Sequence, residues 1–175
     1  MPADSSPADR VVRPLREHRL PLYDGLRQLQ QAAAAVGVAE DPIALAALDA
    51  ALAYLNTSFL PASKAEEFTL FIAVDGALGS IGTTRIMAAQ HRSIAAMAAD
   101  LAKVVEAARK DGDVAAYARY LNPLLFGLYA LIRAHLEAED DVYLGLLDEH
   151  LSESQVGMIV DNLTRIAAGE VHEPH

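Results

Sequence analysis

His135 and Glu139 stand four residues apart in a stretch with the apolar spacing of a long helix. Apolar residues at positions 124, 125, 128, 131 and 132 lead into this stretch, and others follow at 142, 146 and 147. Side chains four apart lie on one face of a helix, so this imidazole and carboxylate can reach the same cation. Such donors suit iron, manganese or zinc better than calcium or magnesium. Taken alone, the pair is equally consistent with an exposed acidic helix face.

Two histidine–glutamate pairs share one longer spacing. The interval in sequence from His18 to Glu66 is the same as the interval from His91 to Glu139. In each half, a histidine from one predicted helix precedes a carboxylate from the next. The repeat predicts that the two helix pairs face each other and bring their donors to one central site, as in di-metal carboxylate bundles.

One position breaks the repeat. Placing His18 on His91 and Glu66 on Glu139 aligns segment 62–67 with segment 135–140. This alignment matches Ala62 with His135, and a methyl group cannot bind a metal ion. The first half therefore lacks one of the donors that the second half provides.

Hydrophobic periodicity predicts four long amphipathic helices and a short fifth one. The four long helices are expected at Pro14–Val36, Ile43–Val74, Thr83 or Thr84 to Lys110, and Val114–Glu149. The short fifth helix is expected to begin at a capping box formed by Ser152 and Gln155 and to end at Gly169. Prolines predict a bend or a late helix start near Pro21, a kink at Pro61 and a break at Asn122–Pro123. Asp41 is expected to cap the second helix, with Pro42 at its first position.

These helices predict an all-α fold, an antiparallel four-helix bundle over residues 13–169 that includes a short C-terminal fifth helix. The chain is 53% hydrophobic but only 6% aromatic, a balance that favours packed helices over sheets. Residues 1–12 are expected to form a disordered tail and residues 170–175 a loose one.

Composition excludes several kinds of site and partner. The chain has no cysteine, which rules out disulfides and thiolate metal sites. Its formal charge of −10 argues against binding to nucleic acid or to an anionic membrane surface. The first eight residues lack the apolar segment of a signal peptide, and we expect no membrane span. The sequence favours a cytoplasmic protein.

The sequence resembles the hemerythrin-like family of HHE cation-binding domains over roughly residues 14–150. The segments that carry the resemblance are Glu17-His18-Arg19, Leu60-Pro61-Ala62 with Ala65-Glu66-Glu67, Met87 with His91, and Leu128-Tyr129 through His135 and Glu139 to Val142-Tyr143. The resemblance implies a four-helix bundle that holds a non-haem di-iron centre. Carried over by position, its metal ligands are His18, Glu66, His91, His135 and Glu139.

Ala62 departs from the family pattern, which places a histidine there. The metal nearer His18 is therefore expected to be held more weakly, with water or an oxygen of Glu67 or Tyr23 filling the gap. A missing ligand also opens a position for a small diatomic molecule or peroxide. The same departure is compatible with a single metal or with none. Restoring the histidine by Ala62→His is expected to raise metal content toward two ions per chain.

Three hypotheses about function follow. The first is an iron protein that binds or senses oxygen, nitric oxide, peroxide or iron itself. The second is a redox enzyme that uses the same site, for example for peroxide breakdown. The third is a helical scaffold or interaction protein whose metal site has decayed. The fold alone does not choose among them, and the sequence identifies no protein partner.

Overall fold

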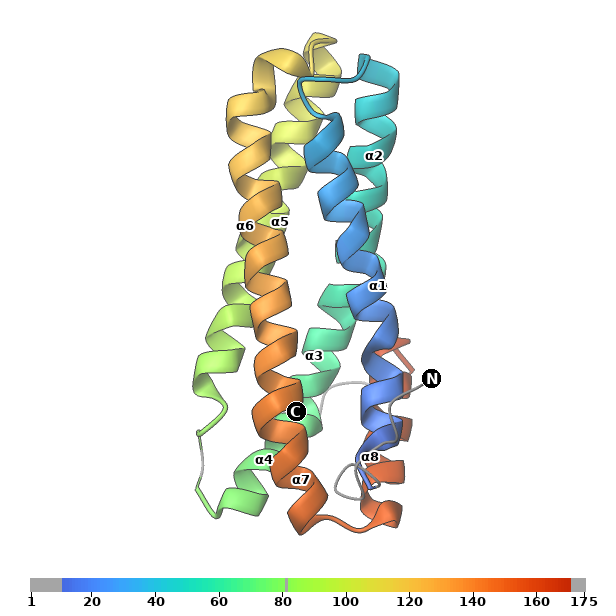
Figure 1. Cartoon of the computed structure of the whole chain (residues 1–175), viewed down its shortest axis with the longest axis vertical. Helices are drawn as coiled ribbons and strands as arrows, with labels where there is room; N and C mark the ends of the chain where they lie inside the picture. Colours follow the sequence, from blue (N-terminus) through green and yellow to red (C-terminus); the bar gives the residue numbers. More distant parts are fainter. Residues whose placement is uncertain (1–10, 81, 171–175) are drawn as a thin grey trace, which may run out of the picture. The chain divides into compact units, whose positions relative to one another are not determined.

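The computed structural model describes residues 11–80 and 82–170, and every regular element in this part is a helix (Figure 1). The all-α class is confirmed, whereas the antiparallel four-helix arrangement stays a prediction. The described residues form two compact units. The first contains residues 11–20, 61–80, 82–88 and 135–170, and the second contains residues 21–60 and 89–134.

The helices follow the predicted segments closely. In chain order they are α1 (Arg13–Ala35), α2 (Asp41–Tyr54), η2 (Leu55–Phe59), α3 (Leu60–Phe68), α4 (Leu70–Leu78), α5 (Arg85–Asp111), η3 (Ala115–Tyr117), α6 (Ala118–Ala138), η4 (Glu139–Tyr143), α7 (Leu144–His150) and α8 (Glu153–Ala167). Two π-helical turns, η2 and η4, interrupt the long predicted helices. Periodicity did not reveal them, because one wide turn changes the apolar spacing very little.

The prolines disturb the helices less than expected. Pro21 lies inside α1 and Pro123 inside α6, and neither ends its helix. Pro61 is the second residue of α3, directly after the π-helical turn η2, so the irregularity predicted there is present. Buried leucines on α1, among them Leu15 and Leu22, hold that helix in the core on both sides of its proline.

The first unit has its own hydrophobic core, to which α4, α7 and α8 contribute. Val74, Leu144, Leu147 and Val156 are fully buried in it. Val12 is buried there as well, and the backbone N–H groups of residues 11 and 12 both donate to Asp148. Residues 11 and 12, which were predicted to belong to the tail, therefore have partners in this unit. The rest of the predicted tails, residues 1–10 and 171–175, lies outside the described residues.

Carboxylates and a capping box fix several helix ends. Ser152 and Gln155 form the predicted capping box at the start of α8. Asp41, in contrast, does not cap α2: the N-cap is Glu40, and the Asp41 carboxylate accepts the N–H of Val114 instead. The prediction failed because the carboxylate has a partner distant in sequence. The carboxylate of Asp75, on α4, accepts the N–H groups of residues 82 and 84, which lie in the connection before α5.

In the second unit, the ring of Tyr54 packs directly against Gly25. The hydroxyl of Tyr54 donates to the carbonyl of Leu22 at 2.8 Å. A Cβ added at Gly25 would stand 2.1 Å from two ring carbons of Tyr54. Real atoms cannot approach so closely, so α1 needs a glycine at this position.

Gly25→Ala is expected to destabilise the protein by about 1–3 kcal/mol, because overpacking would displace the buried ring. Urea unfolding measures this loss. Gly157→Ala is the matched control, since Gly157 lies in α8 and nothing surrounds its added Cβ within 4 Å. That variant should gain up to about 1 kcal/mol from helix propensity. Equal stabilities of the two variants would contradict the close approach of the Tyr54 ring.

One helical stretch, Asp41–Leu78, is long and apolar enough to cross a membrane by length and composition alone, contrary to expectation. The evidence for a span is weak, because core helices of globular domains pass the same test. Leu48, Ala51 and Leu55 of this stretch are fully buried side chains of the protein.

Candidate metal centre

Four buried residues bring metal-binding atoms together. Glu66 of α3, His91 of α5, His135 of α6 and Glu139 of η4 each offer one donor atom, and these atoms lie within 4.8 Å of one another. All four side chains are almost completely buried. The site thus contains the three donors predicted from the second half of the repeat, together with Glu66 from the first half. Two nitrogen and two oxygen donors suit iron, manganese or zinc.

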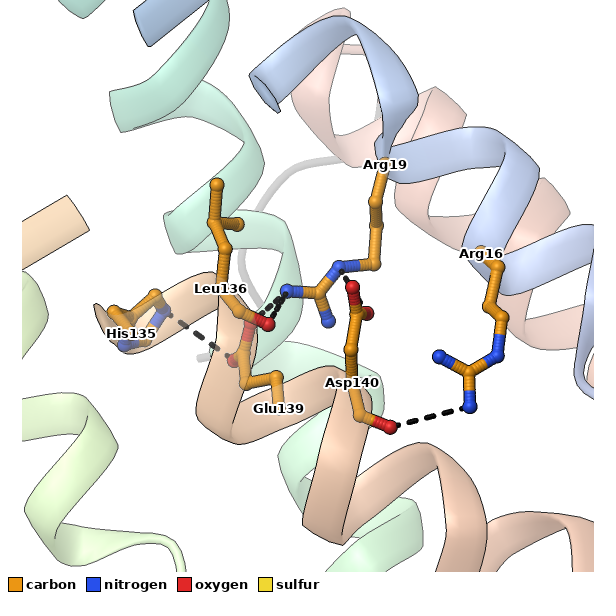
Figure 2. A network of polar contacts seen from close by, with 6 residues as sticks. All are labelled: Arg16, Arg19, His135, Leu136, Glu139 and Asp140. Atoms are coloured by element: carbon orange, nitrogen blue, oxygen red, sulfur yellow. Dashed lines mark hydrogen bonds and ion pairs between the residues drawn. The ribbon is translucent and has the colours of Figure 1, made fainter. Parts of the chain in front are cut away.

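His135 and Glu139 are placed by the end of α6 and the π-helical turn that continues it. Nε2 of His135 lies 3.4 Å from Oε1 of Glu139. Glu139 is the first residue of η4. π-Helical turns are rare and often occur at functional sites, where the extra residue redirects a side chain. Figure 2 shows the two side chains pointing toward each other from neighbouring turns.

His91 is supported on one side by an aromatic ring. The rings of His91 and Phe59 meet edge to face, with 6.4 Å between their centroids and an angle of 83° between their planes. Phe59 is 1% exposed. A close-packed ring restricts the rotamer of the imidazole, so the direction of its nitrogens is set by packing as well as by any ligand.

Arg19 of α1 occupies one side of the site, which the sequence had not indicated. Its Nη2 donates to Oε2 of Glu139 at 2.5 Å and to the carbonyl of Leu136 at 3.4 Å. Its Nε lies 3.5 Å from a carboxylate oxygen of Asp140. The Arg19 side chain is only 2% exposed. Figure 2 shows the guanidinium reaching from α1 to this group of acceptors, while Arg16 binds the Asp140 carbonyl.

Charge and burial work against each other at this site. Burial disfavours the charge of Arg19, but attraction by Glu139, Glu66 and Asp140 outweighs burial and raises the pKa of the guanidinium. Burial, and then repulsion by Glu66, raise the pKa of Glu139 well above its usual value, although Arg19 opposes this shift. Two buried carboxylates near each other need a proton or a cation as compensation. Arg19 supplies part of that compensation.

His18 lies on α1 next to Arg19 and is partly buried, and it is not among the four clustered residues. Burial lowers the pKa of His18; nearby Glu66 acts in the opposite direction, and Arg19 reinforces the lowering. His18 is thus close enough to Glu66 for an electrostatic effect. Its role as a metal ligand stays a prediction.

The chain belongs to the hemerythrin family. Residues 12–147 match the family model described as the hemerythrin HHE cation-binding domain. This match covers most of the chain and confirms the resemblance noted from the motifs. Neither a comparison with curated proteins nor one with solved structures gave a match.

One buried oxygen of the site is suited to a metal ion. Oε1 of Glu139 is buried and accepts no hydrogen bond from any residue in the described part of the chain. An unsatisfied buried carboxylate oxygen is costly, and a coordinated cation would satisfy it. The position of Oε1 beside Nε2 of His135 therefore fits a bound metal ion.

Proposed function

We propose that this protein binds iron through Glu66, His91, His135 and Glu139 and uses the bound ion to bind or sense a small molecule such as oxygen, nitric oxide or peroxide. The observation that supports the proposal most directly is the group of four buried donors within 4.8 Å of one another. Membership of a cation-binding family points the same way. The formal charge of −10 favours a cytoplasmic protein without a nucleic-acid or membrane partner.

The protein would position the ligands of the metal ion, offset the charge of the ion and exclude water from the site. A bound iron ion would supply redox chemistry and a coordination position for the small molecule. Glu139 and Glu66 would offset the charge of the ion, and the imidazoles of His91 and His135 would provide neutral nitrogen donors. The surrounding buried side chains keep bulk solvent out, which strengthens each of these electrostatic interactions. Ala62 provides no donor at the position where the family pattern has a further imidazole.

A metal-free helical scaffold is the second candidate, and one observation favours it. Arg19 already pairs with Glu139, so a positive charge is present in the site without any metal. Such a pair lowers the cost of a charged carboxylate in a protein that holds no cation, although burial and Glu66 still raise the pKa of Glu139. Metal analysis separates the two candidates.

The decisive measurement is the metal content of protein purified without a chelating tag and loaded with Fe(II) without oxygen. We expect bound iron to survive desalting in the wild type and to fall at least tenfold in occupancy in His135→Ala. His150→Ala is the matched control, because that histidine is exposed at the end of α7, its Nδ1 lies 2.9 Å from the carbonyl oxygen of Leu146, and it is not among the four clustered residues. Wild-type protein that retains no metal would support the scaffold instead. Equal loss of iron from both variants would reject the assignment of His135.

A further inference from the structure

We propose that Arg19 takes the place of a second metal ion, so that each chain binds one metal and not two. The inference rests on the proposed function, because it concerns how many ions the same site holds. It also goes beyond the family resemblance, which implies a di-iron centre.

The two oxygens of Glu139 have different surroundings. A carboxylate that bridges two metals gives one oxygen to each of them. In this chain Oε2 receives Nη2 of Arg19 at 2.5 Å, whereas Oε1 faces His135 and accepts no hydrogen bond from the described residues. Figure 2 shows the guanidinium and the imidazole on opposite sides of the carboxylate. Glu139 therefore uses Oε2 for the guanidinium of Arg19 and has only Oε1 available for a metal ion.

Arg19 comes from the helix that carries His18, the ligand predicted for the second metal. Ala62 of α3 contributes only a methyl group where the repeat predicts an imidazole. Arg19 directly follows His18 on α1, so its guanidinium enters the site from the helix that carries the ligand predicted for the second metal. The sequence repeat assigns both Ala62 and the helix of Arg19 to the metal position predicted near His18.

The charges agree with one metal. Glu66, Glu139 and Asp140 can bring three negative charges, and Arg19 brings one positive charge. A single divalent ion makes this group neutral. A second divalent ion would leave two uncompensated positive charges in a buried site, which is strongly unfavourable. Arg19 would also have to give up its bond to Oε2 of Glu139, and its Nη1 already lacks a hydrogen-bond partner among the described residues.

The test compares metal stoichiometry in four proteins loaded with Mn(II), measured by elemental analysis and by electron paramagnetic resonance. We expect one ion per chain in the wild type, with the hyperfine spectrum of an isolated ion. Contrary to the expectation from the sequence repeat, Ala62→His alone should also bind one ion, because Arg19 still holds Oε2 of Glu139. The double variant Ala62→His/Arg19→Leu should bind two ions with an exchange-coupled spectrum.

The matched control is Ala62→His/Arg16→Leu, since Arg16 lies on the same helix and donates to the backbone carbonyl of Asp140. It should bind one ion. Two ions in the wild type, in Ala62→His alone or in this control would overturn the inference. So would one ion in a folded Ala62→His/Arg19→Leu variant. The stoichiometry of the wild type tests the inference even if a variant fails to fold. No metal in the wild type with either Mn(II) or Fe(II) would reject the proposed function together with this inference, whereas two metals would reject the inference alone.

Discussion

Glu139→Leu is expected to destabilise the metal-free protein by about 3 kcal/mol, near the lower end of the roughly 3–5 kcal/mol typical when one partner of a buried ion pair is removed. The variant leaves the guanidinium of Arg19 buried without its closest acceptor. The loss stays near the lower end because Asp140 still lies 3.5 Å from Nε and because the repulsion between Glu139 and Glu66 disappears. Urea unfolding with a chelator present measures the change.

A second substitution tests whether this loss comes from the uncompensated charge. The double variant Arg19→Met/Glu139→Leu replaces both charged partners with apolar side chains, which is often neutral or stabilising for a buried pair. We expect it to recover most of the lost stability. Glu137→Leu is the control on the same helix, since Glu137 is exposed, and its effect should stay within about 0.5 kcal/mol. A double variant that is less stable than Glu139→Leu would show that the pair contributes net stability.

Much of the donor set could be predicted from spacing. His135 and Glu139 are one helical turn apart, and one shared interval linked His91 with Glu139 and His18 with Glu66. Spacing of this kind survives folding because the donors lie on helical segments whose phase is set by buried apolar residues. Of these five residues, the structure brings all but His18 into one group.

Arg19 could not be assigned to the site from the sequence. An arginine beside His18 in a helix that also carries Arg13, Arg16 and Arg27 looks like part of a solvated charged face. What distinguishes Arg19 is its burial, and burial depends on which residues of other helices meet that position of α1. The only sequence signal was its place inside the Glu17-His18-Arg19 segment of the family resemblance.

The π-helical turn at Glu139 could not be predicted from the sequence either, because it also depends on contacts with other helices. The sequence of η4, with Glu139, Asp140 and Asp141 in succession, contains nothing that departs from ordinary helix propensity. A π-helical turn arises where tertiary contacts offset the weaker local hydrogen bonding. The first half shows its own π-helical turn at Leu55–Phe59, before Glu66 and not beginning at it. The sequence repeat is therefore not repeated in the backbone.

Metal binding is expected to produce a large rise in thermal stability. An ion that binds only the folded chain stabilises it by about 4 kcal/mol when its free concentration is 1,000 times its Kd. For a domain of this size, each kcal/mol raises Tm by roughly 2–4 °C. Wild-type protein saturated with Fe(II) without oxygen should therefore unfold about 8–16 °C higher than the chelator-treated protein.

The matched pair Glu66→Gln and Glu67→Gln assigns this stabilisation to the site. Glu66 is buried and belongs to the donor group, whereas Glu67 is its partly exposed neighbour on α3. Glutamine keeps the size of the side chain but removes the charge that offsets a bound cation. The rise in Tm should shrink by more than half in Glu66→Gln and persist in Glu67→Gln, each compared with its own metal-free form. A rise that is unchanged in Glu66→Gln would place the stabilising ion elsewhere in the chain, because the loss of a buried ligand charge must weaken an ion bound beside it.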